Sequence, residues 1–238
     1  MKNQYFGDIR DLFKYDLVLE LLSENKFLDC FCFIPMLTAN QSSSHGGMTN
    51  YDRARAGTQR TELRSFLEKC VRENRRNINE LKEFFGTYSL GRRIDFAIYK
   101  PDEHFSDKIR TRYFDEVELG VLCKSLILVD PDIGLEVKSM KGREENYITF
   151  SEVKFLFDRM GRCSVLMIFQ FIPRVRRSEY FSQLGRKLRK VVNSPPVLWV
   201  SDNQVAFFVV TKNFRIQRLI MNTISRYGKT YNLITGRS

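Results

Sequence analysis

The sequence predicts an α/β fold with a mainly parallel sheet that closes in an antiparallel hairpin. Strand-like and helix-like segments alternate through the second half of the chain, as in βαβ units. Residues 125–130 ("SLILVD") are expected to form a strand, and residues 163–171 ("CSVLMIFQF") are apolar without alternation, which is typical of a strand buried on both faces. Residues 196–211 ("PVLWVSDNQVAFFVVT") hold two apolar runs around Asp202 and Asn203, a pair that favours a hairpin turn.

The first half is expected to begin with a helix and a buried strand. Residues 8–23 place apolar side chains at helical spacing, and residues 27–34 form an apolar run rich in aromatics. The polar stretch at about 36–58 predicts a long loop, of the kind that can act as a lid.

A helical insertion is expected at about 59–120. Residues 59–85 are rich in helix formers, residues 92–100 ("RRIDFAIYK") suit a short strand, and residues 105–120 suit a helix with Ser106 as its cap. The elements expected in the second half are a strand at 125–130, a helix at 148–161 ended by Gly161, a strand at 163–171, a helix at 178–192, the hairpin at 196–211 and a helix at 214–228.

The composition indicates one folded domain over residues 1–238. The chain is 43% hydrophobic and 13% aromatic, which is enough for a core. No apolar run approaches the ~20 residues of a membrane helix, and no signal peptide is apparent, so we expect a cytoplasmic protein without membrane association. The five cysteines suit reduced core thiols, and two histidines are too few for a zinc site.

The net charge of +11 is unevenly distributed along the chain. Residues 1–138 contain 21 basic and 22 acidic side chains, whereas residues 139–238 contain 18 and 6. A basic half favours binding to phosphates, so we expect nucleic acid, either RNA or DNA, as a partner. Because charge alone specifies no partner, a basic protein without such a ligand remains the alternative.

A cluster of carboxylates follows the strand at 125–130, in the sequence "DPDIGLE". In α/β folds, ligands bind at the carboxyl ends of the strands. We therefore expect catalytic roles for Asp130, Pro131, Asp132 and Glu136. The alternative is an Asp-Pro turn with solvated carboxylates.

The stretch "LILVDPDIGLE" resembles the motif of adenine-N6 methyltransferases, in which Asp-Pro-Pro-Tyr or Asn-Pro-Pro-Tyr follows a strand. Asp130 and Pro131 match this motif; Asp132 and Ile133 depart from it, so the aromatic that stacks on a flipped base is absent. The resemblance implies a Rossmann-like, methyltransferase-like sheet and S-adenosylmethionine as cofactor. It also implies that Asp130 accepts a hydrogen bond from a target amino group.

The N-terminal sequence is similar to the opening helix of the large-subunit ribosomal-RNA adenine-N6 methyltransferases, which carries Gly-Asn, Ala-Asp and Lys-His. Gly7-Asp8, Asp11 and Lys14-Tyr15 hold comparable places. The resemblance implies that Asp8, Asp11, Lys14 and Tyr15 bind substrate. From spacing alone, the same residues form an ordinary solvated helix face.

Four motifs together resemble an uncharacterised bacterial family: Tyr-Phe-Gly-Asp, Met-Leu-Thr, Asp-Pro-Asp-x-Gly-Leu/Ile-Glu and Gln-x-x-Pro-Arg. The chain carries them at 5–8, 36–38, 130–136 and 170–174. The match spans most of the chain and implies no established activity.

Two further residues, Gln170 and Arg174, are candidates for substrate binding. Gln170 stands inside an apolar strand, where a buried amide needs hydrogen-bond partners. Arg174 begins a basic series that could contact phosphates. The alternatives are a core hydrogen-bond bridge and a solvated basic face. The basic series comprises Arg174, Arg176, Arg177, Arg186, Lys187, Arg189 and Lys190.

Met36 and Thr38, directly after the first strand, are the expected cofactor-binding residues. Methyltransferases of this fold usually carry a Gly-x-Gly turn there, which lets the backbone approach the cofactor. This chain has no glycine pair before Gly46-Gly47, which follow His45 deep in the predicted loop.

The sequence "GLEVK" also matches part of a restriction-type nuclease motif, an Asp followed later by Glu-x-Lys. Glu136 and Lys138 fit that motif, and Asp132 with Glu136 could hold Mg²⁺. Asp95 or Asp115 could supply the remaining carboxylate. A third alternative is a catalytically inactive module of the same fold that binds nucleic acid or protein.

Overall fold

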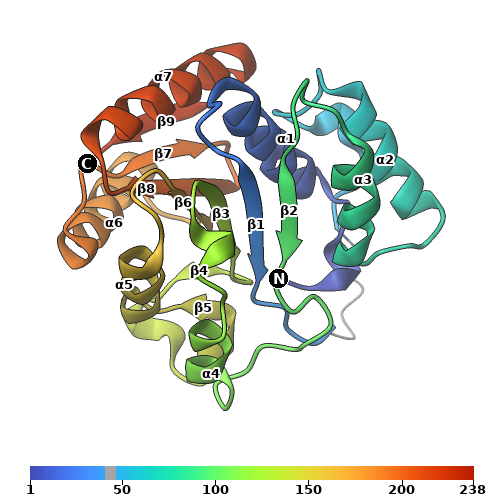
Figure 1. The fold of residues 1–238 in the computed structure, drawn as a ribbon. Coiled ribbons are helices and arrows are strands. Elements are labelled where there is room, and N and C mark those ends of the chain that lie inside the picture. The colour runs from blue at the N-terminus through green and yellow to red at the C-terminus, as the bar shows by residue number, and fades with distance from the viewer. Residues whose placement is uncertain (41–46) are drawn as a thin grey trace.

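The fold is built on one seven-stranded sheet with the strand order β2-β1-β3-β6-β8-β7-β9 (Figure 1). The structure, a computed structural model, describes residues 1–40 and 47–238; His45 and Gly46 of the predicted lid lie outside this part. The strands are β1 Cys30–Pro35, β2 Asp95–Ile98, β3 Ser125–Asp130, β6 Val165–Phe171, β7 Leu198–Ser201, β8 Val205–Thr211 and β9 Ile234–Arg237.

The strand directions confirm the predicted Rossmann-like α/β architecture. Strands β2, β1, β3 and β6 form a parallel core. Strand β8 is antiparallel to both β6 and β7, as expected for the hairpin, and β9 is antiparallel to β7. In the hairpin turn, Asp202 Oδ1 accepts hydrogen bonds from the N–H groups of Gln204 and Val205, at 2.6 and 2.8 Å.

Helices cover both faces of the sheet, which gives three layers (Figure 1). Alternate strand side chains point to opposite faces. Thus Phe31 and Phe33 pack with α1, α2, α3 and α7, whereas Cys32 and Ile34 pack with α4, α5 and α6. The helices are α1 Ile9–Glu24, α2 Thr61–Arg72, α3 Leu81–Thr87, α4 Arg110–Asp115, α5 Phe150–Arg159, α6 Arg177–Val192 and α7 Phe214–Tyr231.

The sequence missed β9 and a small second sheet, formed by β4 (Gly134–Leu135) and β5 (Tyr147–Ile148). Strands of two residues are too short to show a period, and β9 is mostly exposed, so neither carries an apolar signal. The first strand begins at Cys30 rather than at residue 27, because the N–H of Leu28 still closes a turn onto Asn25.

The predicted end of α5 is wrong in detail. Thr149 and Glu152 form a reciprocal capping box at its start. The helix then ends at Arg159, because Met160 is already extended, with ψ of 154°. Gly161 lies beyond the helix, where its N–H donates to the carbonyl of Leu122.

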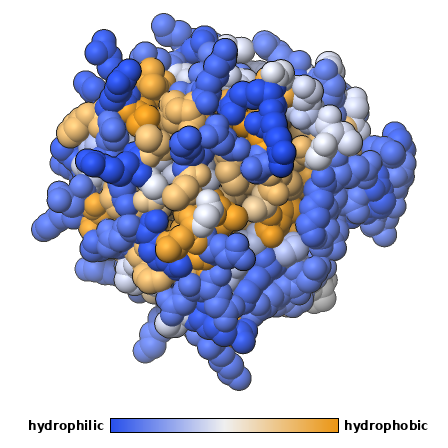
Figure 2. All heavy atoms as spheres, in the orientation of Figure 1, coloured by the Kyte–Doolittle hydropathy of each residue, from blue (hydrophilic) through white to orange (hydrophobic). Residues whose placement is uncertain are grey.

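The predicted cap at Ser106 is also wrong. Helix α4 begins only at Arg110, and Ile109 precedes it without a side-chain cap. The segment 59–120 contains α2, α3 and α4, together with β2 at the edge of the sheet. No helix within the described ranges is both long and apolar enough to cross a membrane. On the face shown in Figure 2, hydrophobic residues gather toward the middle and hydrophilic ones surround them.

Gly134 is a position where the fold requires glycine. Its φ is +144°, and a Cβ there would lie 2.4 Å from Oε1 of Gln170. We expect Gly134→Ala to lower the free energy of unfolding by about 2 kcal/mol or more, since strain and overpacking act together. Urea denaturation would measure this.

The control is Gly86→Ala in α3, where a Cβ meets no atom within 4 Å. That substitution should be neutral or stabilise by up to about 1 kcal/mol, because alanine favours helix. Equal losses of stability in both variants would contradict the requirement for glycine at residue 134.

Candidate functional site

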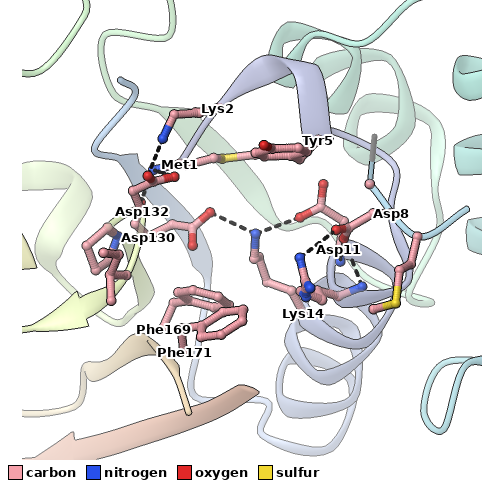
Figure 3. A pocket seen from close by; sticks show the side chains of 15 residues that line it. Met1, Lys2, Tyr5, Asp8, Asp11, Lys14, Asp130, Asp132, Phe169 and Phe171 are labelled. Atoms are coloured by element: carbon pink, nitrogen blue, oxygen red, sulfur yellow. Dashed lines mark hydrogen bonds and ion pairs between the residues drawn. The ribbon is translucent and has the colours of Figure 1, made fainter. Parts of the chain in front are cut away.

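A cavity of about 570 Å³ opens at the carboxyl ends of β3 and β6 (Figure 3). Strands β2 and β3 lie on opposite sides of β1, so the cavity adjoins the point where the strand order reverses. Open α/β sheets bind ligands in this region. The wall consists of Met1, Lys2, Tyr5, Asp8, Arg10, Asp11, Lys14, Gly47, Met48, Asp130, Pro131, Asp132, Ile133, Phe169 and Phe171.

Lys14 is the centre of the polar network in this cavity. Its Nζ donates to Asp11 Oδ1 at 2.6 Å and to Asp130 Oδ2 at 2.7 Å, and 6% or less of each of the three side chains is exposed. Burial alone would lower the pKa of Lys14, but the charges of Asp11 and Asp130 outweigh it and raise the pKa above its usual value. Lys14 is therefore a permanent cation that joins α1 to β3.

The first turn of α1 holds Asp8 and Asp11 in place. Asp8 Oδ1 accepts from the N–H groups of Arg10 and Asp11, at 2.9 and 3.1 Å, as a helix cap. Asp11 Oδ2 accepts from the N–H of Gly7 at 2.9 Å. Burial, followed by the negative charge of Asp11, raises the pKa of Asp8 to about 7. Asp8 therefore changes charge near neutral pH.

The turn after β3 supplies two carboxylates with different surroundings. Burial raises the pKa of Asp130, against the opposing charge of Lys14. Its Oδ1 makes no hydrogen bond within the part of the chain that the structure describes. Asp132 forms an ion pair with Lys2, and Lys2 and the Met1 amino group lower its pKa despite its burial. Asp130 is thus a buried acceptor with one oxygen still available.

Tyr15 and Gln170, both predicted to bind substrate, do not line the cavity. The Tyr15 ring is fully buried, and its hydroxyl has no partner among the described residues. Gln170 bridges β6 and β4, because Oε1 accepts from the N–H of Leu135 at 2.9 Å and Nε2 donates to the carbonyl of Phe171 at 2.8 Å. Gln170 is therefore a hydrogen-bond bridge in the core, which was the alternative to substrate binding in the sequence analysis.

The backbone directly after β1 already uses most of its hydrogen-bonding groups within the chain. The N–H of Met36 donates to the carbonyl of Asp130, and the N–H of Thr38 donates to that of Met1. The Met36 carbonyl accepts from Met1, and the Leu37 carbonyl accepts from the N–H of Phe105. Neither Met36 nor Thr38 lines the cavity. These residues do not fit S-adenosylmethionine in its usual seat over the first strand.

Gly47 lines the cavity at a point where the chain passes close to Asp8. It lines the wall against α1, where a Cβ would lie only 2.9 Å from the Cβ of Asp8. A glycine is required for this approach.

Glu136, Lys138 and Arg174 lie outside the main cavity. Asp132 and Glu136, the alternative magnesium ligands, line two different hollows. The nuclease residues are therefore not gathered around one pocket. The second hollow, of about 290 Å³, is lined by Glu136, Val137, Lys138, Met140, Lys141, Glu144 and Lys187.

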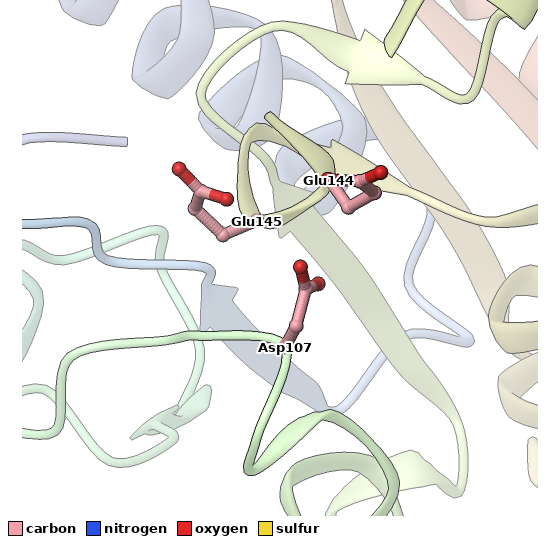
Figure 4. Close-up of side chains that lie close together, drawn as sticks. All are labelled: Asp107, Glu144 and Glu145. Atoms are coloured by element: carbon pink, nitrogen blue, oxygen red, sulfur yellow. The ribbon is translucent and has the colours of Figure 1, made fainter. Parts of the chain in front are cut away.

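Asp107, Glu144 and Glu145 form the one acidic group of metal-binding dimensions found in the described ranges (Figure 4). Arg110 lies within this group, since its Nη2 donates to Asp107 Oδ1 at 2.9 Å and to the Glu144 carbonyl at 2.6 Å. Arg110 thus joins the start of α4 to the segment before β5, and we assign no metal to the acidic group.

Several residues of the cavity were not found from the sequence. Phe169 and Phe171 lie two residues apart at the end of β6 and both line the cavity. The sequence did not reveal this, because nearly all residues of this strand are apolar and no alternation marks one face. Lys2, Arg10 and Met48 carry no motif and reach the cavity only through folding.

Comparison with models of protein families and with curated proteins finds no match to this chain.

Lys14→Met tests the buried network. Two buried carboxylates would lose their cation, so we expect the free energy of unfolding at neutral pH to fall by about 3–5 kcal/mol. Part of this loss should be regained in acid, where the carboxylates are protonated. Urea denaturation at two pH values would measure both effects.

Lys154→Met is the matched control. The exposed pair of Lys154 with Asp158 has the same 2.7 Å separation. Removing it should cost less than about 1 kcal/mol. A similar small loss for Lys14→Met would show that the buried network contributes little.

Asp8→Asn tests the raised pKa. The pKa of Asp8 is 3.8 ordinarily and about 7 in the folded chain. Between these values the folded state keeps a proton that the unfolded state releases, so this group's stabilisation is lost as pH rises. Relative to the unmodified chain, Asp8→Asn should gain stability from pH 4 to pH 7, by about 1.4 kcal/mol per unit of pKa shift.

Unfolding free energies across this pH range provide the measurement. Asp52→Asn, at a side chain that is 82% exposed, should show no such gain. Parallel curves for Asp8→Asn and the unmodified chain would mean that Asp8 is ionised throughout.

Proposed function

We propose that this protein is a methyltransferase-fold protein that binds nucleic acid, with a base in the cavity and the phosphates on the basic residues between β6 and the end of α6. The resemblance at Asp130-Pro131 and in the first turn of α1 suggested this function. The strand order supports it. Antiparallel β8 stands between β6 and β7, and an antiparallel last strand is what the resemblance to Rossmann-like methyltransferases implies.

The chemistry of the cavity suits an uncharged planar group that carries an amine. Lys14, Asp11, Asp132 and Lys2 already have partners of opposite charge, so the interior offers little to a second ion. The free Oδ1 of Asp130 can accept a hydrogen bond from an exocyclic amino group. The Phe169 ring provides an apolar wall beside it. A nucleobase combines these properties.

The observation that carries the proposal is the distribution of unpaired positive charge. Of the 18 basic residues in 139–238, only Lys154, Arg176 and Arg226 form ion pairs within the described part of the chain. Most basic residues of the first half are paired, for example Arg60, Arg75 and Lys100. Exposed cations without acidic partners are available to phosphates. Those at or near α6 are Arg174, Arg186, Lys187, Arg189 and Lys190.

S-adenosylmethionine is the cofactor that the resemblance implies. Because the N–H groups of Met36 and Thr38 and the carbonyls of Met36 and Leu37 are already paired within the chain, we derive no step through this cofactor. If the protein only binds nucleic acid, it corresponds to the third alternative from the sequence, a catalytically inactive module of the same fold.

Fluorescence anisotropy with short labelled oligonucleotides tests the proposed function. The unmodified chain should bind them, with an affinity that falls steeply as salt rises. The triple variant Arg174→Ala/Lys187→Ala/Lys190→Ala should bind about tenfold or more weakly, with a shallower salt dependence, because phosphate contacts are lost. Titration with S-adenosylmethionine in parallel would show whether the cavity takes that ligand instead.

The control removes the same charge from the opposite face of the sheet. Arg215→Ala/Arg218→Ala/Lys229→Ala changes three exposed cations of α7. Its affinity should stay within about threefold of the unmodified chain, since α7 packs on the other face of the sheet from α6 and none of these three side chains lines the cavity. Equal losses in both triple variants, or no oligonucleotide binding at low salt, would overturn the proposed function.

A further inference from the structure

Phe171 is an exposed aromatic at the mouth of the cavity. It is the last residue of β6, and 38% of it is exposed, whereas the six strand residues before it are buried. The ring also lines the cavity, so one side chain belongs to both the pocket and the outer surface. Burial in the core therefore does not explain an aromatic here.

Arg10 lies against this ring and is itself held in place. Its guanidinium carbon lies 5.2 Å from the centre of the Phe171 ring. Nε donates to Gln204 Oε1 at 3.2 Å, and Nη1 donates to Asp8 Oδ2 at 3.3 Å. The arginine–aromatic pair is thus ordered before any ligand arrives, which lowers the entropic cost of binding.

The mouth continues into apolar and basic surface. Met48, 39% exposed, contacts Gln204 through its sulfur. Arg177 donates to Asn203, the neighbour of Gln204 in the hairpin turn, so a second cation is anchored to the turn that holds Arg10. Arg174 and Arg176 follow Phe171 within five residues and are exposed.

The depth of the acceptor restricts how a base can reach it. Asp130 is only 2% exposed and lies behind the rim that Phe171 forms. A base that is paired and stacked within a duplex cannot enter so far, whereas an unpaired base can. Aromatic rings and arginine planes are the usual partners of unpaired bases.

We propose that the nucleic acid bound here is single-stranded, and that Phe171, supported by Arg10, stacks on the base next to the one that enters the cavity. Since this presupposes the nucleic-acid binding proposed above, the experiment separates the two. Phe171 recognises the strand by its base planes; the cations recognise it by its phosphates.

Competition binding tests this role. A labelled single strand is displaced by the same unlabelled strand or by its duplex. The duplex should compete at least about tenfold less well, because its bases are not available. Phe171→Ala should weaken single-strand binding by about 5- to 100-fold, the range for one lost base stack. Its salt dependence should stay unchanged, since no phosphate contact is removed.

Two further variants act as controls. Phe171→Trp keeps a stacking face and should retain most of the affinity. Phe214→Ala removes an aromatic that is 68% exposed at the start of α7, and it should leave binding within about twofold, because that ring lies away from the cavity.

Two results would overturn the stacking role while nucleic-acid binding stands: a duplex that competes as well as the single strand, or Phe171→Ala that binds the single strand normally. If the unmodified chain binds neither form, the proposed function itself fails. Thermal unfolding of each variant confirms that the chain remains folded.

Discussion

The ion triad of Lys14, Asp11 and Asp130 is the interaction on which the rest of this site depends. It connects the first turns of α1 to the end of β3 with hydrogen bonds of 2.6 and 2.7 Å, between side chains that are each 6% exposed or less. Each of these charges would be costly to bury alone, so the three fix one another's positions. The floor of the cavity is therefore set by electrostatics, and the apolar core only brings the two elements together.

Charge is divided between the interior and the surface of this region. Inside, carboxylates and cations neutralise one another, and Asp130 keeps one free oxygen. Outside, the arginines and lysines around α6 mostly lack acidic partners within the described residues. A ligand with neutral planar groups on an anionic backbone suits both the charge-balanced interior and the unpaired cations outside it.

Much of the fold was predictable because its signals are local. The apolar runs of β3 and β6 and the Asp202 turn appear directly in the sequence, and the structure agrees. The candidate residues Asp8, Asp11, Lys14, Asp130 and Asp132 do line one cavity. Glu136, four residues after Asp132, does not, because β4 begins between them and leads the chain away. Closeness in sequence is thus a poor guide to closeness across a strand end.

The sequence by itself determined the α/β class, the parallel core, the closing hairpin and the carboxylates after β3, since periodicity and turn chemistry are short-range properties. Only the tertiary structure decided that Lys14 lies between Asp11 and Asp130, because Lys14 and Asp130 are 116 residues apart in the sequence. It also decided that Gln170 bridges the core, and that Arg10 lies on Phe171 at the cavity mouth. These contacts join distant segments, and their partners are selected by burial and charge balance in the assembled layers, which no local pattern records.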